Sequence, residues 1–190
     1  DELPDAAVSA AASVEPDAND YRVMVPLANP NTERDLIKLG GAIAKHHGGT
    51  LHAVHIVTVP DQTDLQYAKE HLGEFDGDTA GVLEQARLDA EEFEVPIETH
   101  TVISHRGFEE VFDAATTHEA DTVVMGWGGN SHGSPGRIES AYDEVMQKLP
   151  CDFIVMKDRG FDPSRVLVPT AGGPDSELSA AVARILRDAY

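Results

Sequence analysis

The chain has 190 residues, with 34 acidic against 14 basic side chains and a formal net charge of −20. Such a surface argues against nucleic acids and anionic membranes as partners, because phosphate binding needs clustered cations. No apolar run approaches the ~20 residues that cross a bilayer. A single cysteine, Cys151, excludes an intrachain disulfide and fits a reducing cytoplasm, while the acid-rich, lysine-poor composition indicates a salt-loving host.

Residues 1–20 are rich in Ala, Asp and Pro and lack large apolar side chains, so we expect a linker, with helix allowed in residues 5–13. Short apolar strands then alternate with segments of helical periodicity. The expected strands are 22–27, 50–59, 96–104, 121–126 and 152–157. The expected helices are 32–49, 78–93, 106–120 and 138–148.

This alternation predicts an α/β fold built from βαβ units around a parallel sheet. Strands such as VMV and FIVM are apolar on both faces, as expected for a sheet covered by helices on both sides. In the first helix one apolar face carries Leu36, Leu39, Ile43 and Ala44. We therefore expect three layers, with an open sheet between two layers of helices.

An internal repeat links the start and the end of the sequence. Residues 22–28 read RVMVPLA and residues 165–171 read RVLVPTA, a full domain apart. We expect one complete domain at 21–157, a linker at 158–163, and the first strand and helix of a truncated second copy at 164–190. A lone strand and helix cannot bury their apolar faces, so this piece should dock on the first domain or on another chain.

A glycine-rich loop, GWGGNSHGSPGRIES, occupies residues 126–140, after the fourth expected strand. A P-loop is excluded because the loop has no lysine, and the dinucleotide fingerprint fails at Ser131. Gly129–Gly133 matches the nucleophile motif G-x-S-x-G, but that hydrolase fold needs a later histidine and His132 is the last one. The remaining interpretation is a nest of backbone N–H groups for a phosphate.

The loop's spacing resembles the universal stress protein family, whose nucleotide-binding members carry G-x2-G-x9-G-[S/T] after the fourth strand. Gly126, Gly129 and Ser140 match this pattern, and VMVP, AVHIV and VVMG are also similar to that family. The resemblance covers residues 21–157 and implies the adenine-nucleotide α-hydrolase-like fold, with five parallel strands in the order 3-2-1-4-5. Ligands in such sheets bind where the strand order reverses.

The resemblance implies a nucleotide site for ATP or AMP between the first and fourth expected strands. Its candidate residues are Pro26, Leu27, Ala28, Ile56, Met125, Gly126, Trp127, Gly129, Arg137, Glu139 and Ser140. Two of them depart from the family. Ala28 stands where nucleotide-binding relatives carry an aspartate, and Glu139 replaces the last glycine with a carboxylate that repels phosphate. Nucleotide binding and a degenerate or altered site therefore both remain open.

Other chemistry-bearing residues give weaker patterns. Of the nine histidines, His46 and His47 are adjacent in an expected helix. His52 and His55 lie on opposite faces of an expected strand, and the sequence contains no HExxH motif and no Cys–His cluster. We therefore predict no metal site. Cys151 opens an apolar strand and is interpreted as a small packed side chain.

The chain begins at Asp1 and ends after an expected helix, and we expect both ends to continue in a longer protein. The tandem repeat and residues 149–179 resemble the cytosolic tails of haloarchaeal amino-acid permeases. This resemblance implies a non-catalytic regulatory domain in the cytoplasm, attached to a membrane transporter for amino acids, cationic ones included. The alternatives are a stand-alone ATP- or AMP-binding stress protein and, more remotely, a weak hydrolase or ATPase.

The last strand, 152–157, is an apolar edge, so we expect a homodimer or pairing with a second copy.

Overall fold

The structure is a computed structural model. It describes residues 7–12, 21–28, 30–77, 81–126, 151–157 and 159–190. Within these ranges no helix is both long and apolar enough to pass through a membrane.

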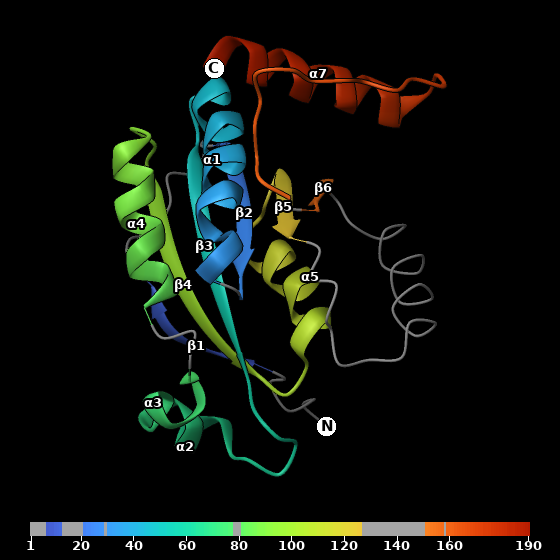
Figure 1. Ribbon diagram of the computed structural model, residues 1–190. Helices are drawn as coiled ribbons and strands as arrows, with labels where there is room; N and C mark the ends of the chain where they lie inside the picture. Colours follow the sequence, from blue (N-terminus) through green and yellow to red (C-terminus); the bar gives the residue numbers. More distant parts are fainter. Residues whose placement is uncertain (1–6, 13–20, 29, 78–80, 127–150, 158) are drawn as a thin grey trace.

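A six-stranded sheet forms the middle of the molecule (Figure 1). Its strands are β1 (Ala7–Ala12), β2 (Arg22–Leu27), β3 (Thr50–Thr58), β4 (Ile97–Ser104), β5 (Thr122–Gly126) and β6 (Asp152–Met156). They lie in the order β1-β4-β3-β2-β5-β6, and every neighbouring pair from β4 to β6 is parallel. Without β1, this order is the expected 3-2-1-4-5, so the predicted fold class is confirmed.

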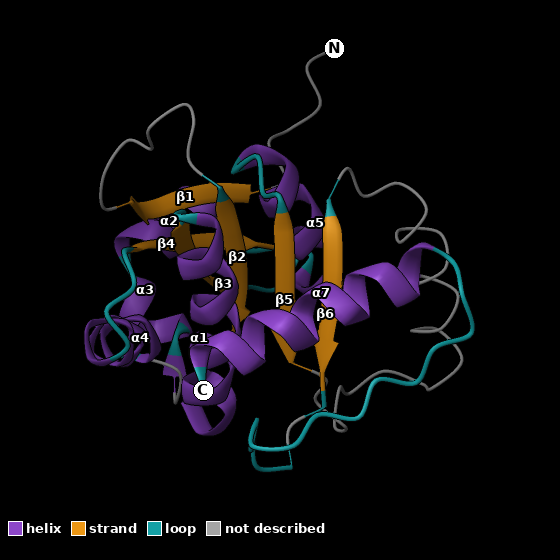
Figure 2. Cartoon of the chain, turned by 90° about the horizontal axis from the view of Figure 1, so that it is seen from above, coloured by secondary structure: helices purple, strands orange, loops and turns teal. Residues whose placement is uncertain are grey.

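Helices cover both faces of the sheet. They are α1 (Pro30–His47), α2 (Leu65–Glu70), α3 (Leu72–Phe75), α4 (Val82–Glu92), α5 (Gly107–Thr117) and α7 (Pro174–Ala189). Figure 2 shows α1 and α4 on one side of the sheet and α5 on the other. Along β2, Val23 and Val25 pack toward α1 while Met24 packs toward α5. All three are fully buried, as the alternation of a doubly covered strand requires.

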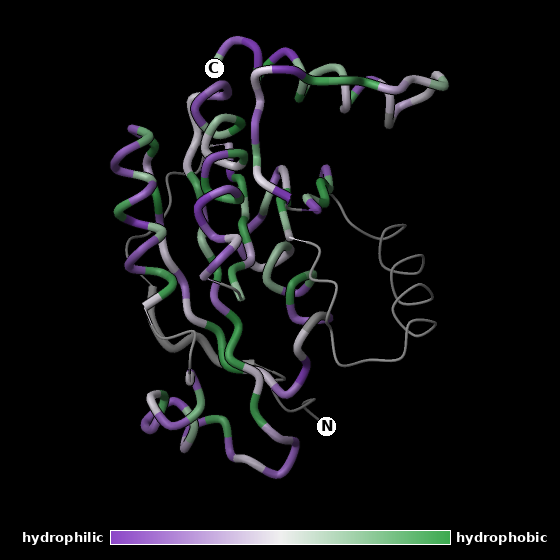
Figure 3. The backbone as a smooth tube through the Cα atoms, viewed as in Figure 1, coloured by the Kyte–Doolittle hydropathy of each residue, from purple (hydrophilic) through white to green (hydrophobic). Residues whose placement is uncertain are grey.

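The apolar face predicted for α1 is confirmed, since Leu36, Leu39, Ile43 and Ala44 are all buried. Figure 3 shows the same pattern for the domain, with hydrophobic residues following the central strands and hydrophilic ones the outer turns of α4. The helix starts at Pro30, two residues before the expected position. Proline suits the first position of a helix because an N–H group there has no partner within the helix. The helix ends as expected at Gly48, whose φ of +67° suits glycine.

Close approach of α1 to the sheet depends on Gly40. A Cβ added there would lie 2.8 Å from Val25 Cγ2 and 3.0 Å from Leu51 Cδ1. Any side chain would therefore push α1 away from β2 and β3.

The N-terminal segment differs from the expectation. Residues 7–12 pair antiparallel with β4, from Ala7 opposite Ser104 to Ala12 opposite His100. The helix allowed at 5–13 is thus wrong for these residues, and this part of the expected linker is a strand. The physical reason is that the free edge of β4 offers a row of backbone hydrogen-bonding groups, and pairing them outweighs the helix propensity of alanine.

The C-terminal segment meets the expectation only in its helix. α7 forms and crosses the end of the domain at which α1 ends (Figure 1). It docks on the core through Ile185 and Leu186, which are 5% and 6% exposed. The strand expected at the start of residues 164–190 does not form, and Leu167 is 90% exposed. In Figure 3 this hydrophobic stretch runs outside the domain just before α7.

Other boundaries agree with the sequence within a few residues. α4 and α5 lie inside the expected helices at 78–93 and 106–120. α2 and α3 fall in a polar stretch for which no helix was predicted. The helix expected at 138–148 lies outside the described residues.

Candidate nucleotide-binding edge

The strand order reverses at β2. This strand pairs with β3 on one side and with β5 on the other, in the registers Leu27–His55 and Met24–Val123. Because all three strands are parallel, their carboxyl ends lie at one edge of the sheet. That edge is the position at which open α/β sheets bind ligands.

Six of the eleven candidate residues are described, and all six are at the carboxyl ends of β2, β3 and β5. They are Pro26, Leu27, Ala28, Ile56, Met125 and Gly126. The other five, Trp127, Gly129, Arg137, Glu139 and Ser140, lie outside the described residues. These six residues therefore lie at one edge of the sheet, and their role in nucleotide binding stays a prediction.

The described candidates differ in their access to solvent. Leu27 and Met125 are 1% and 9% exposed, so their side chains belong to the core. Ala28 is exposed, and Pro26 and Ile56 are half-buried. All six are apolar or glycine, so this part of the edge offers backbone groups and apolar surface but no hydrogen-bonding side chain.

Gly126 approaches the start of α1. A Cβ there would lie 3.4 Å from Leu36 Cδ1 and 3.9 Å from Thr32 Oγ1. The positive, N-terminal end of the dipole of the eighteen-residue helix α1 therefore adjoins the end of β5. This arrangement favours an anion at the edge.

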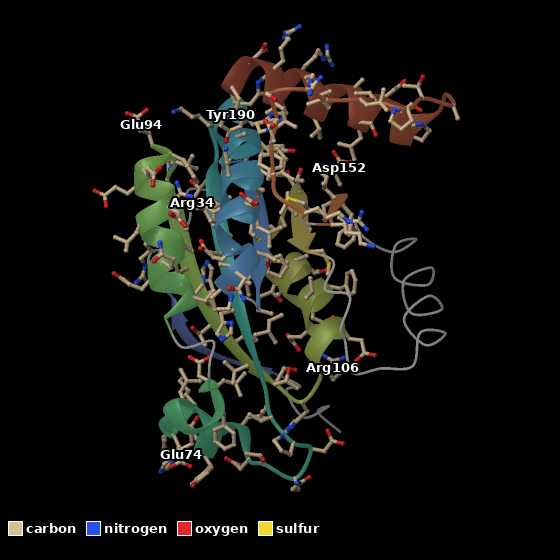
Figure 4. All side chains as sticks on the ribbon, viewed as in Figure 1. Arg34, Glu74, Glu94, Arg106, Asp152 and Tyr190 are labelled. Carbon is tan, nitrogen blue, oxygen red and sulfur yellow. The ribbon has the colours of Figure 1, made fainter. Side chains whose placement is uncertain are left out.

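A buried acid lies in that first turn. Glu33 is 1% exposed, and burial together with the neighbouring Asp89 carboxylate raises the pKa of Glu33 to about 8. Arg34 bridges α1 to α4 by pairing with Asp89 and, at 2.7 Å, with Glu92 (Figure 4). At neutral pH most of Glu33 is protonated, so it adds little negative charge near the N-terminus of α1.

His55 holds the end of β2 in position, a role that the sequence did not predict. Its Nδ1 lies 2.8 Å from the carbonyl oxygen of Leu27, and its Nε2 lies 2.7 Å from Asp76 Oδ1. The ring thus ties the last residue of β2 to the segment after α3. No sequence pattern links residues 55 and 76, so only the fold brings them together.

Comparisons with known proteins decide the family. A model described as the universal stress protein family matches residues 21–157. The chain belongs to this family. Its universal stress domain therefore contains the whole parallel part of the sheet, and α7 lies outside the matched residues.

Solved structures of the family share this fold. A universal stress protein from Lactobacillus plantarum is 21% identical with a TM-score of 0.52, covering 74% of this chain and 100% of that one. One from Burkholderia pseudomallei is 16% identical with a TM-score of 0.52, covering 75% and 100%. A universal stress protein in complex with cAMP is 18% identical with a TM-score of 0.51, covering 73% and 97%.

One curated relative is a transporter. The Na(+)/H(+) antiporter NhaS5 from a Synechocystis strain is 26% identical over 145 residues. The alignment covers 76% of this chain but only 20% of the antiporter. The chain thus spans about a fifth of the length of that relative.

A separate pocket of about 430 Å³ lies between the ends of α1 and α4 and the last turns of α7. Its lining includes Lys45, Phe93, Ile185 and Tyr190, and none of the candidate nucleotide residues. It lies where α1 ends, whereas the candidate edge adjoins its first turn. This pocket is therefore distinct from the family's switch-point site.

Cys151 agrees with its interpretation as a packed side chain. It is half-buried against the apolar cluster under α5. Burial, followed by the Asp152 and Asp121 carboxylates, raises the pKa of the Cys151 thiol. A protonated thiol is a poor nucleophile.

The universal stress domain also brings three histidines together, at a place for which the sequence predicted no metal site. His52, His100 and His118 approach one another between the sheet and the end of α5. Burial, followed by the charges of His118 and His52, lowers the pKa of His100 to about 4. The alternation of side chains along each strand placed His52 and His100 on defined faces, but only the β3–β4 register shows that these faces coincide.

Proposed function

We propose that the chain is a regulatory, non-catalytic universal stress domain attached to a membrane transporter. The observation that carries this proposal is the similarity to the NhaS5 antiporter. The aligned part covers 20% of the length of that transporter. A module of this size, with the expected start of a second copy after it, fits a cytosolic appendage to a membrane domain. An amino-acid permease, with cationic amino acids as one substrate class, is the more specific form of this proposal.

The test is the size and location of the native protein. An antibody against residues 21–157 should detect a membrane-bound band much larger than the 20.4 kDa of this chain. A soluble band near that mass would reject the transporter and favour a stand-alone stress protein. The stand-alone alternative has its own support, because the alignments cover 97–100% of three single universal stress proteins.

We further propose that the β2–β5 edge is an altered nucleotide site. The similar protein with cAMP supports an adenine nucleotide, and ATP or AMP is the ligand expected of the family. Ala28, exposed at the end of β2, supplies no carboxylate for the nucleoside. Glu139 opposes the phosphates, so we expect weak binding by the natural sequence.

Restoring the missing carboxylate tests this site. Ala28→Asp should tighten binding of AMP or ATP·Mg by about tenfold, because a charge-assisted hydrogen bond to the nucleoside is gained. Isothermal titration against the natural sequence measures the change. The matched control is Ala171→Asp, the same substitution at the exposed equivalent position of the repeat, which should leave affinity unchanged. Equal affinity of all three proteins would reject the edge as a nucleotide site.

The last strand of the sheet, β6, supports a paired assembly. β6 is the edge of the sheet, and its Val155 is 39% exposed. An apolar strand at the edge of the described sheet promotes association, so we propose that β6 pairs with a second copy or with a second universal stress domain. Val155→Lys should shift the chain from dimer to monomer in light scattering. A monomer before the substitution would reject pairing.

The acidic composition supports a salt-loving host. With a net charge of −20, self-repulsion should weaken the fold in dilute buffer, and KCl should screen it. Unfolding midpoints that do not change between dilute and concentrated KCl would contradict this part of the proposal.

A further inference from the structure

Four polar side chains meet on the α5 side of the sheet. His52 lies on β3, Glu98 and His100 lie on β4, and His118 is the first residue after α5. His52 and His100 are 2% and 5% exposed. Buried groups of this kind must be satisfied by one another or by a ligand.

The β3–β4 register explains why they meet. His52 pairs with Glu98, and His100 is two residues further along β4, so all three side chains project to one face. Val54, two residues after His52, packs against the apolar cluster under α5, which identifies this face. α5 ends at Thr117, and the next residue, His118, lies over this face of the sheet.

The distances are those of a ligand set. His52 Nδ1 lies 3.3 Å from His100 Nε2. Glu98 Oε2 lies 3.8 Å from the first of these atoms and 3.7 Å from the second. One ring nitrogen from each of the three histidines lies within 4.8 Å of the others.

These distances match the chemistry of zinc. Ligand atoms about 2.0–2.2 Å from a tetrahedral Zn²⁺ ion are separated from one another by roughly 3.3–3.6 Å. The His52–His100–Glu98 triangle has nearly these sides, and a ring nitrogen of His118 lies within 4.8 Å of a ring nitrogen of each of the other two histidines. The three imidazoles favour Zn²⁺ over Mg²⁺ or Ca²⁺, which prefer oxygen ligands.

One charge opposes a cation here. The Arg22 guanidinium is near enough to His118 to lower the pKa of that ring, an effect second to burial. However, Arg22 Nη1 is paired with Glu119 Oε2 at 2.7 Å and with the carbonyl oxygen of His118 at 3.4 Å. Its charge is therefore offset by Glu119, while Glu98 faces the histidines.

We propose that His52, Glu98, His100 and His118 form a Zn²⁺ site that fastens the end of α5 to β3 and β4. Four protein ligands close the coordination sphere, so the site is structural rather than catalytic. It lies on the other face of the sheet from α1 and does not depend on the nucleotide proposal.

Titration of the full chain with Co²⁺, after removal of metal by a chelator, tests the site. One equivalent of Co²⁺ should produce the visible d–d absorption of a tetrahedral nitrogen-and-oxygen site, and one equivalent of Zn²⁺ should abolish it. A competing chelator and concentrated KCl keep weak binding by the acidic surface from contributing. Zn²⁺ should also raise the thermal midpoint of unfolding, since it binds only the folded chain.

The variants His100→Gln and His118→Gln should each weaken Zn²⁺ affinity by at least about 100-fold. The matched control His46→Gln, at the exposed end of α1, should bind like the natural sequence. Circular dichroism of the metal-free proteins shows which variants fold, and the less buried His118 provides a test if the His100 variant does not. Absence of a stoichiometric tetrahedral Co²⁺ spectrum, or unchanged affinity in a folded variant, would overturn the proposal.

Discussion

Residues 22–28 and 165–171 share an arginine, two valines, a proline and an alanine, yet they have different structures. The first forms β2, with Met24 fully buried. The second forms no strand, and Leu167, at the position equivalent to Met24, is 90% exposed. The difference teaches that this heptapeptide becomes a strand only where neighbouring strands pair with it, because β-propensity reflects packing on a pleated surface more than the local backbone.

The largest expected effect comes from truncating the two equivalent side chains. Met24→Ala should lower the free energy of unfolding by about 2–5 kcal/mol, since it leaves a cavity between the sheet and α5. Leu167→Ala should change it by less than about 0.5 kcal/mol, because the side chain is 90% exposed. Urea unfolding measures both. A similar loss from the two substitutions would mean that Leu167 is buried in solution by an assembly of chains.

The same contrast explains what sequence could foresee. Apolar periodicity was sufficient for the five parallel strands and for the face of α1, because burial on both sides of a sheet leaves a strong pattern. It failed at residues 7–12, where an unpredicted strand forms, and at residues 165–171, where the expected strand does not form. The first segment is a strand because it pairs with the edge of β4, whereas no described strand pairs with the second segment.

Site prediction followed the same division. The ends of β2 and β5 could be placed at one edge because the family's strand order was expected. The cluster of His52, Glu98, His100 and His118 could not, because its members are up to 66 residues apart (118 − 52) and depend on a strand register. Sequence alternation assigns a face to each strand residue but does not say which residue lies beside it on the next strand.

The helices that follow the two heptapeptides sharpen the comparison. Gly40 in α1 is equivalent to Ala183 in α7, and only Gly40 lies against β2 and β3. Gly40→Ala should destabilise the domain by about 1–3 kcal/mol, because its methyl group would overlap Val25 and Leu51. At Gly73 in α3, an added Cβ would meet nothing within 4 Å, so Gly73→Ala serves as the control and should not destabilise. Equal midpoints for the two variants would contradict the close approach of α1.

The smallest expected effect concerns acids early in the same two helices. Glu33 in α1 is buried with a pKa of about 8, whereas Glu177 in α7 is exposed. The unfolded chain loses this proton near pH 4.5 and the folded chain holds it to about pH 8. The contribution of Glu33 is therefore fully present below pH 4.5 and is lost as the pH rises to 8.

Glu33→Gln should remove this dependence, because an amide keeps the shape of the neutral acid without titrating. The variant should match the natural sequence near pH 5 and exceed its free energy of unfolding above pH 8. Urea unfolding across this range, as a difference between the two proteins, cancels the titration of the other acids. Glu177→Gln should show no such difference, since an exposed carboxylate is solvated in both states. A constant difference at every pH would mean that Glu33 is ionised in the folded domain, and that its burial beside Asp89 is sustained by the Arg34 bridge rather than by a proton.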